Sequence, residues 1–218
     1  KMLGDVFNLK GIDLDAPQTK FLGYKDFETK AQILKIIKDN ISVKKISEGD
    51  EARIITDLTV FYPESGGQVA DTGELVKGKN IFQVLDTRKT DKVIIHIGKL
   101  KLGLLKAGDS ISAKIDIGRR LSIARNHTAT HLLQAALRKV LGIHVQQQGS
   151  LVSPDKLRFD FTHFKDVNQE ELDRVEEMVN TYIIENHPLK AKLMPLSEAT
   201  RSGALAFFAE KYEGKARE

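Results

Sequence analysis

The chain has 218 residues, 41% of them hydrophobic and 29% charged, with a formal net charge of +4 and no cysteine. This composition is typical of a globular protein, and the lack of cysteine excludes disulfide bonds and thiolate metal ligands within these residues. No apolar run reaches the roughly 18 residues that a membrane-spanning helix needs, so no membrane contact is predicted and a cytoplasmic location is expected. The sequence starts at Lys1 without a signal-peptide pattern, which indicates a piece of a longer polypeptide.

Residues 1–46 are predicted to be a linker followed by one amphipathic helix. The N-terminal residues mix Gly, Pro and Asp without a clear period, as linkers do. Between Asp26 and Asn40 apolar residues recur at helical spacing, which predicts a helix over that range. The apolar positions with this spacing are Phe27, Ala31, Leu34 and Ile37 or Lys38.

Residues 47–118 are predicted to form a small antiparallel β-barrel-like subdomain. Short β-rich runs follow one another here, broken by clusters of Gly, Asp, Lys and Asn. No segment long enough for a helix lies between them, which argues against βαβ units. The runs are RIITDLTVFYP, GQVADTGELV, NIFQVLDT, KVIIHIG and SISAKIDI.

Residues 119–218 are predicted to form an α+β core in which helices pack on a mostly antiparallel sheet. The periodicity changes at Arg119 to that of a long helix, followed by the strand-like runs IHVQQQGSLV and LRFDFTHF. A second helix is expected to begin at Asn168, with Glu171 as its capping-box partner, and to stop at Pro188. LKAKLMP is then predicted as a strand, and Ser197 opens a short helix. The fold class predicted for the whole chain is therefore α+β.

The long helix, which is expected to end at Gly142, divides into two stripes. The stripe predicted to be buried holds Leu121, Ala124, Thr128, Leu132, Ala135, Ala136 and Val140. The adjoining polar stripe holds His127, Thr130, His131, Gln134 and Arg138. A polar stripe beside a buried one is typical of the wall of a cleft, and equally of an ordinary solvated face.

Two histidines on this helix, His127 and His131, form a candidate half of a metal site. Residues four apart lie about one turn apart, so both imidazoles leave the same face and can converge on one ion. Zinc suits such a pair because neutral imidazole is a good zinc ligand. Thr128 follows the first histidine, so the metalloprotease pattern, which needs Glu there as general base, does not apply. Two histidines that only hydrogen-bond their neighbours remain the alternative.

Three segments carry a resemblance to a known family. They are VFYPESGGQVADTG (60–73), RNHTATHLLQAALRKVLGIHVQQQGSLV (125–152) and LRFDFTHF (157–164). In this order they resemble the editing region of alanyl-tRNA synthetases and of their free-standing editing relatives. The resemblance extends over most of the chain from about residue 50 onward, and it marks the chain as part of a protein that handles the alanine tRNA.

The resemblance implies a domain that hydrolyses the ester joining a wrong amino acid, serine or glycine, to the alanine tRNA. It also implies a zinc ion held by the two helix histidines, here His127 and His131, and by a Cys and a His from a later Cys-xxx-His motif. These 218 residues contain no such motif, so weak zinc binding and weak or no activity are expected of the chain alone. ATP and magnesium would serve only the aminoacylation domain of the parent alanine-tRNA ligase.

Discrimination between amino acids explains why such a site is needed. A pocket built for alanine cannot exclude glycine sterically, and one missing methyl changes binding by only about 1–3 kcal/mol. A hydrolytic site can instead recognise the serine hydroxyl by hydrogen bonds. The candidates for this role are Thr130, Gln147 and Ser150, which match pocket residues of the family that the chain resembles. Without the resemblance, a local helix bond for Thr130 and a solvent-facing Gln147 would be favoured.

The predicted contacts to the acceptor end of the tRNA come from two other clusters. Arg119, Arg120 and Arg125 lie at the start of the long helix and form a basic patch suited to phosphates, unless they are an ordinary solvated face. The Gly66–Gln68 triplet predicts a tight turn whose glycines take positive φ, and such a loop can also approach the acceptor end. Asp71 is expected to cap this turn or to orient a neighbour.

Two alternatives remain open, and a third is disfavoured by Thr128. A free-standing trans-editing deacylase would use the same chemistry, and its partners would not include the other domains of a synthetase. An RNA-binding module without catalysis would leave the histidines metal-free. A protease-like zinc hydrolase needs a Glu where Thr128 stands. His144, His163, His96 and His187 are weaker ligand candidates, although His144 is close enough in sequence to serve as a third ligand.

Overall fold

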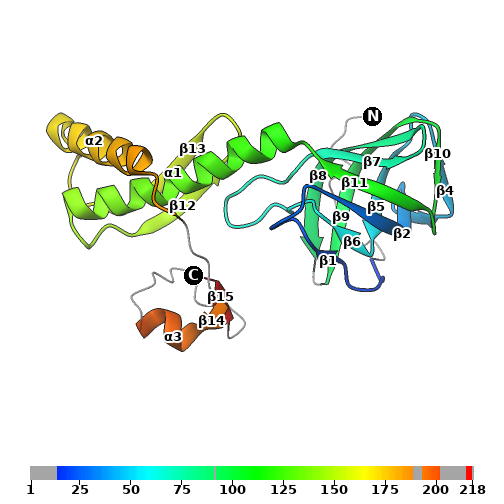
Figure 1. The fold of residues 1–218 in the computed structure, drawn as a ribbon, viewed down its shortest axis with the longest axis horizontal. Helices are drawn as coiled ribbons and strands as arrows, with labels where there is room; N and C mark the ends of the chain where they lie inside the picture. The colour runs from blue at the N-terminus through cyan, green and yellow to red at the C-terminus, as the bar shows by residue number, and fades with distance from the viewer. Residues whose placement is uncertain (1–13, 91, 189–192, 202–214, 218) are drawn as a thin grey trace. The chain divides into compact units, whose positions relative to one another are not determined.

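A computed structural model describes residues 14–90, 92–188, 193–201 and 215–217 (Figure 1). They form two compact units. The first unit holds the described residues up to His127 together with Leu151–Leu157, and the second holds Thr128–Ser150 and the described residues from Arg158 onward. The predicted α+β class is confirmed, since helices accompany sheets that are antiparallel in nearly every pairing.

The strands of the first unit begin close to the described N-terminus. They are β1 (Lys20–Phe21), β2 (Glu28–Lys38), β3 (Ile41–Val43), β4 (Lys45–Ser47), β5 (Glu51–Thr56), β6 (Leu58–Thr59), β7 (Gly73–Lys77), β8 (Asn80–Thr90), β9 (Val93–Leu102), β10 (Leu104–Lys106) and β11 (Ser110–Ile115). The helix α1 (Ile117–Leu141) has residues in both units. The remaining elements are β12 (Gln147–Val152), β13 (Leu157–Phe161), α2 (Gln169–Glu185), β14 (Leu193–Pro195), α3 (Leu196–Arg201) and β15 (Lys215–Arg217).

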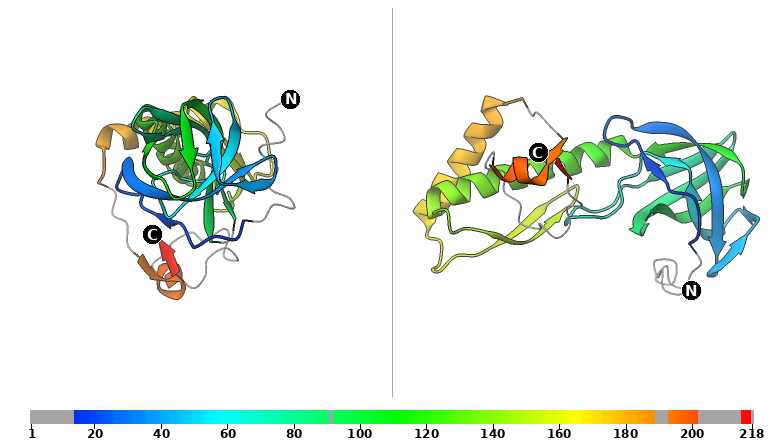
Figure 2. Two further views of the ribbon diagram at one scale, coloured as in Figure 1. Left: turned by 90° about the vertical axis from the view of Figure 1, so that its right-hand side faces the viewer. Right: turned by 90° about the horizontal axis from the view of Figure 1, so that it is seen from below.

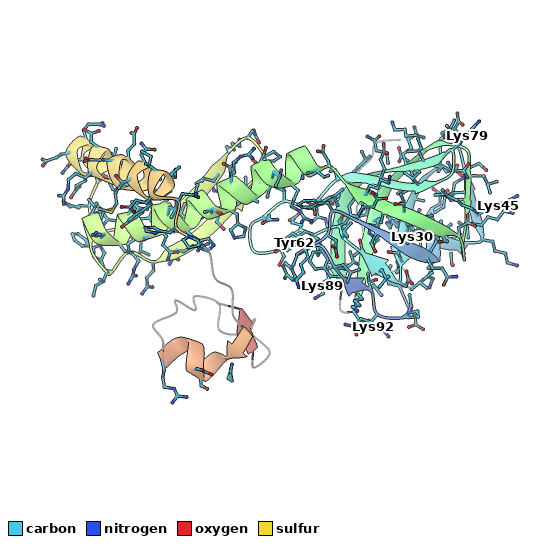
Figure 3. All side chains as sticks on the ribbon, viewed as in Figure 1. Lys30, Lys45, Tyr62, Lys79, Lys89 and Lys92 are labelled. Carbon is cyan, nitrogen blue, oxygen red and sulfur yellow. The ribbon has the colours of Figure 1, made fainter. Side chains whose placement is uncertain are left out.

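A closed β-barrel forms the body of the first unit, as predicted (Figure 2). The strands pair in the order β11-β7-β8-β9-β5-β2-β3, and a further pairing of β11 with β2 closes six of them into a ring. Closure pairs the edges that an open sheet would expose. The barrel core includes the buried side chains of Ile33, Ile36, Ile54, Leu75, Phe82, Leu100 and Ile111. Exposed lysines project from the outside of the barrel, among them Lys30, Lys45 and Lys79 (Figure 3).

The helix predicted between Asp26 and Asn40 is wrong, because this segment is the barrel strand β2. β2 pairs with β11 on one side and with β5 on the other, so part of residues 1–46 contributes to the barrel. A shift in the β2–β5 register between Ile33 and Lys35 changes which residues face inward. The buried positions therefore step from Ala31 to Ile33 and then to Ile36, and the three-residue step imitates helical spacing.

The second unit packs helices against a two-stranded sheet of β12 and β13. The buried cluster of this unit consists of Ala136 and Leu137 of α1, Val175 of α2, and Val145 from the segment after α1. Phe159 and Phe161 of β13 pack against it. The predicted capping box of α2 is confirmed, with Asn168 accepting from the backbone N–H of Glu171 at 2.9 Å. The short helix at Ser197 is confirmed as α3. Of the strand predicted from LKAKLMP, Leu193–Pro195 is observed as β14 and residues 189–192 lie outside the described residues.

None of the helices in the described part of the chain combines the length and the apolar character that crossing a membrane requires.

Gly98 on β9 is expected to tolerate no side chain. A Cβ placed there would lie 1.9 Å from the carbonyl oxygen of Gln83 on the neighbouring strand β8. Gly98→Ala should therefore lower the free energy of unfolding by about 1–3 kcal/mol through overpacking. Gly118→Ala on α1 is the control, since its Cβ would meet nothing nearer than 3.5 Å and alanine favours helix by up to about 1 kcal/mol. Equal stabilities of the two variants in urea titrations would contradict the expected clash.

His96 is a core residue of the barrel, and it makes the stability of the protein depend on pH. Its Nδ1 bonds the carbonyl oxygen of Ile54 at 3.0 Å, and its Nε2 lies 2.7 Å from the hydroxyl of Thr59. A carbonyl oxygen only accepts, so Nδ1 carries the proton of the neutral ring and the Thr59 hydroxyl donates to Nε2. Complete burial lowers the pKa of His96 to about 4.

The lowered pKa means that His96 is protonated more readily in the unfolded chain than in the folded one. Acidification therefore lowers the free energy of unfolding. Nothing is lost above the unfolded pKa of about 6.5, and up to about 3 kcal/mol is lost as pH falls from there to about 4. Urea titrations at several pH values measure this slope. His96→Gln should flatten the slope over that range, and an unchanged slope would show that His96 is not its source.

Candidate functional site

Two residues of the polar stripe of α1 are buried, whereas most of the stripe predicted to be buried is not, so the predicted orientation of this helix is only partly right; Ala136 is buried as predicted. Thr130 and Gln134 are 6% and 8% exposed, whereas Leu121 of the stripe predicted to be buried is 44% exposed. Ala124, Thr128 and Ala135 of that stripe are exposed as well. The side chains that α1 buries are Ile123, Thr130, Gln134, Ala136 and Leu137. A helix that buries Thr and Gln places polar groups where each needs a hydrogen-bonding partner.

His127 and His131 lie in one continuous helix, as predicted, four positions apart. His127 is half-buried and His131 is exposed. Within the described residues no group of three or more His, Cys, Asp or Glu side chains is arranged to hold a metal ion. Zinc binding by the pair stays a prediction.

The Gly66–Gly67 turn has the backbone that its sequence predicts. Gly66 has φ of 59° and Gly67 has φ of 82°, both in the left-handed region. Ser65 and Gln68 bond to each other across the turn, with N–H to oxygen distances of 3.2 and 3.0 Å. The prediction that these glycines allow positive φ is confirmed, and the turn presents Gln68 at its end.

Backbone bonds to Val152 hold this turn in the first unit. The N–H of Val152 donates to the carbonyl of Gly67 at 2.8 Å, and its carbonyl accepts from Val69 at 3.0 Å. Gln68 is 8% exposed. Its side-chain Oε1 lies 2.6 Å from Nδ1 of His127, so the turn contacts the first of the two helix histidines.

A buried ion pair joins the same loop to the start of α1. The Arg120 guanidinium bonds both carboxylate oxygens of Asp71, and its Nη1 donates to the carbonyl of Gly23 at 2.7 Å. The side chains of Asp71 and Arg120 are 1% and 12% exposed. Asp71 also accepts from the backbone N–H of Tyr62 at 2.7 Å, so it caps the loop between the two residues and, through Arg120, orients a neighbour.

The three arginines proposed to hold phosphate have different surroundings. Arg120 is committed to Asp71, and Arg119 donates to the carbonyl of Ala70 at 2.6 Å. Arg125 is exposed, and its guanidinium donates to the hydroxyl of Ser122, three residues earlier on the helix, at 2.9 Å. Of the three, Arg125 is therefore the one whose guanidinium faces solvent.

The predicted pocket residues belong to the second unit. Thr130 is buried on α1, and Gln147 and Ser150 lie half-buried on β12. Sequence reasoning placed Gln134 on the stripe without giving it a role. Its amide nitrogen is buried with no hydrogen-bond partner among the described residues. Its spacing of four from Thr130 is the signal that places it on the same face.

The other described histidines have structural partners. His144 Nε2 lies 2.9 Å from His163 Nδ1, and the two rings stack. His187 bonds the carboxylate of Glu185 at 3.0 Å. His144 therefore pairs with another histidine of the second unit.

Comparison with known proteins identifies the family. The family described as tRNA synthetases class II (A) matches residues 6–119, just over half of the chain. Alanine--tRNA ligase of Halorhodospira halophila is 46% identical over 199 residues, which cover 91% of this chain and 23% of that protein. The corresponding enzyme of Hydrogenovibrio crunogenus is 48% identical over 194 residues, covering 89% and 22%. That of Dechloromonas aromatica is 46% identical over 202 residues, covering 92% and 23%.

The chain thus spans about a quarter of the length of the curated relatives it matches. The family match covers β1–β11 and the start of α1, and the relatives extend the likeness across most of the sequence. This chain belongs to the class II (A) tRNA synthetase family.

Proposed function

We propose that this chain carries the editing site of an alanine-tRNA ligase, which hydrolyses seryl- and glycyl-tRNA(Ala). The observation that carries the proposal is the hydrogen bond between Gln68 and the ring of His127. His127 lies on the same helix as His131, four positions earlier. A ring fixed through one nitrogen is what a metal-ligating histidine needs. The matched relatives are named alanine--tRNA ligases, and this name is the basis for proposing alanine and its tRNA as the substrates of the parent enzyme.

The residues of this chain fit a zinc ion at the helix pair. Oε1 of Gln68 is an acceptor, so it favours the His127 tautomer that leaves a lone pair on Nε2, the form that ligates a metal. His127 and His131 would supply two ligands, and the Cys-xxx-His motif of the resembled family would supply the others. A bound zinc ion would polarise the ester carbonyl, activate water or position the substrate.

Serine recognition would use side chains of α1 and β12. Thr130 is buried, and its hydroxyl would accept from or donate to the hydroxyl of a bound serine, a bond that discriminates because a polar group left unmet in a buried site costs about 1–3 kcal/mol. Gln147 and Ser150 would supply further polar groups on the following strand. Alanine lacks the hydroxyl, so correctly charged tRNA would gain none of these bonds.

The proposed tRNA contacts divide into direct and indirect ones. Arg125 is exposed and would approach a phosphate of the acceptor end. Gly66, Gly67 and Gln68 form the turn beside His127, while Arg119 and Arg120 hold that loop to α1. ATP, magnesium, the remaining synthetase domains and a cytoplasmic location belong to the proposed parent ligase.

A deacylation assay combined with filter binding tests the proposal. The polypeptide to use joins this sequence to the Cys-xxx-His segment that its resemblance to the editing region implies. We expect release of serine from seryl-tRNA(Ala) well above the rate in buffer, in a zinc-dependent manner. Binding of tRNA(Ala) without release of serine would overturn catalysis and favour the RNA-binding module instead. If that polypeptide were as active as a full-length ligase, the result would favour a trans-editing deacylase, which works without the other synthetase domains.

A further inference from the structure

We propose that Gln68 is a positioning residue that keeps the proton of the His127 ring on Nδ1, so that Nε2 is the nitrogen presented to zinc. The inference rests on the proposed function for the role of His127 as a ligand. It adds a residue from a distant loop, 59 positions away in the chain, to the machinery of the site.

The direction of one hydrogen bond decides which nitrogen carries the proton. Oε1 of Gln68 and Nδ1 of His127 lie 2.6 Å apart. A carbonyl oxygen has no proton to give, so Nδ1–H is the donor. A neutral imidazole carries one N–H only, and therefore its Nε2 holds a lone pair. A free imidazole has only a weak preference for a proton on Nε2, and this hydrogen bond outweighs it. Gln68 therefore determines which nitrogen of His127 carries the proton.

Gln68 is itself held in place, so its side chain can hold the His127 ring in one orientation. Its backbone closes the Gly66–Gly67 turn by two bonds to Ser65 and lies in a bridge with Val152. The residue is 8% exposed, so its side chain has little room to turn away. Because the amide is buried, the bond to His127 also satisfies a polar group that would otherwise lack a partner.

The loop that contains Gln68 and Asp71 contacts α1 at two residues on one face of the helix. Asp71 bonds Arg120, and Gln68, three residues earlier, bonds His127. Arg120 and His127 are seven residues apart, which is close to two helical turns. The first contact fixes where the loop meets the helix, and the second then fixes the ring. The Gly-Gly turn and the buried Asp71–Arg120 ion pair therefore hold one short loop against α1.

The test measures the tautomer and the zinc affinity of the full 218-residue chain. Nitrogen-15 chemical shifts of the His127 ring, recorded without metal at pH 8, should show a protonated Nδ1 and an unprotonated Nε2. In Gln68→Ala the ring should become a mixture of tautomers. Titration with zinc alone, followed through the same signals, should give a Kd raised about 10- to 100-fold, as for the loss of other outer-shell partners.

Two further variants separate a positioning role from a structural one. Gln68→Glu keeps an acceptor at the same place and should restore the Nδ1–H tautomer and most of the zinc affinity. Gln169→Ala removes an exposed glutamine of α2, bonded to Asp173, and should change neither reading. Failure of Gln68→Glu to rescue the tautomer would overturn the proposal.

Other outcomes distinguish this inference from the proposed function. A proton on Nε2 of His127 in the unaltered chain would mean that Gln68 donates its amide N–H to Nδ1, and would overturn the inference outright. The expected tautomer with no zinc binding by the polypeptide that includes the Cys-xxx-His segment would support the hold of Gln68 on the ring and overturn the metal site of the proposed function.

Discussion

Replacing Arg120 with alanine is expected to lower the free energy of unfolding of the first unit by about 3–5 kcal/mol. The substitution leaves the Asp71 carboxylate, which is 1% exposed, without its counter-charge. It also removes the donors to the carbonyls of Gly23 and Val60. Few single changes cost this much, and those that do commonly strand a buried charge. Urea titration followed by far-ultraviolet circular dichroism measures the loss.

Two control variants separate the buried charge from general effects of removing an arginine. Arg88→Ala breaks the partly exposed pairs with Asp86 and Glu64 and should cost about 1 kcal/mol or less. The double variant Arg120→Met with Asp71→Leu removes both charges and should be more stable than Arg120→Ala alone. A loss from Arg120→Ala no larger than that from Arg88→Ala would contradict the buried ion pair.

His131→Ala is expected to reduce deacylation of seryl-tRNA(Ala) at least about 100-fold, the size of loss seen when a group that stabilises charge at a reacting centre is removed. The proposed site offers two imidazoles on α1, and loss of one halves the ligands that this chain supplies. The assay uses the polypeptide that includes the Cys-xxx-His segment, with zinc content measured on the same samples.

The matched control for this variant is His187→Ala. His187 is exposed beyond the end of α2 and pairs with Glu185, so its removal should leave both zinc content and deacylation unchanged. If His131→Ala retained the activity of the His187→Ala control, the helix pair would not be the metal site.

The barrel could be predicted from the sequence, but one of its strands could not. Runs such as KVIIHIG alternate or stay apolar over short lengths with turn residues between them, which suffices to predict antiparallel strands. β2 misleads because its register shift between Ile33 and Lys35 breaks the two-residue period. A bulge depends on the partner strand, and no local pattern in Glu28–Lys38 reveals it.

The backbone of the Gly66–Gly67 turn was predictable from residue type, whereas the side-chain contacts around it were not. The positive φ of Gly66 and Gly67 follows from residue type alone. In contrast, the contact of Asp71 with Arg120 spans 49 positions, and composition gives no hint of which arginine turns inward. The face that α1 buries was missed for a related reason. Burial of Thr130 and Gln134 in place of Leu121 is decided by packing partners far away in sequence, which overrides local hydrophobicity.

The most direct measurement is the ratio of hydrolysis rates for seryl-tRNA(Ala) and alanyl-tRNA(Ala), with the polypeptide that completes the zinc ligands. An editing site that recognises a hydroxyl through Thr130 should release serine much faster than alanine, and Thr130→Val should bring the two rates closer together. Equal rates for the two substrates, or no hydrolysis of either above buffer, would contradict the proposed editing function.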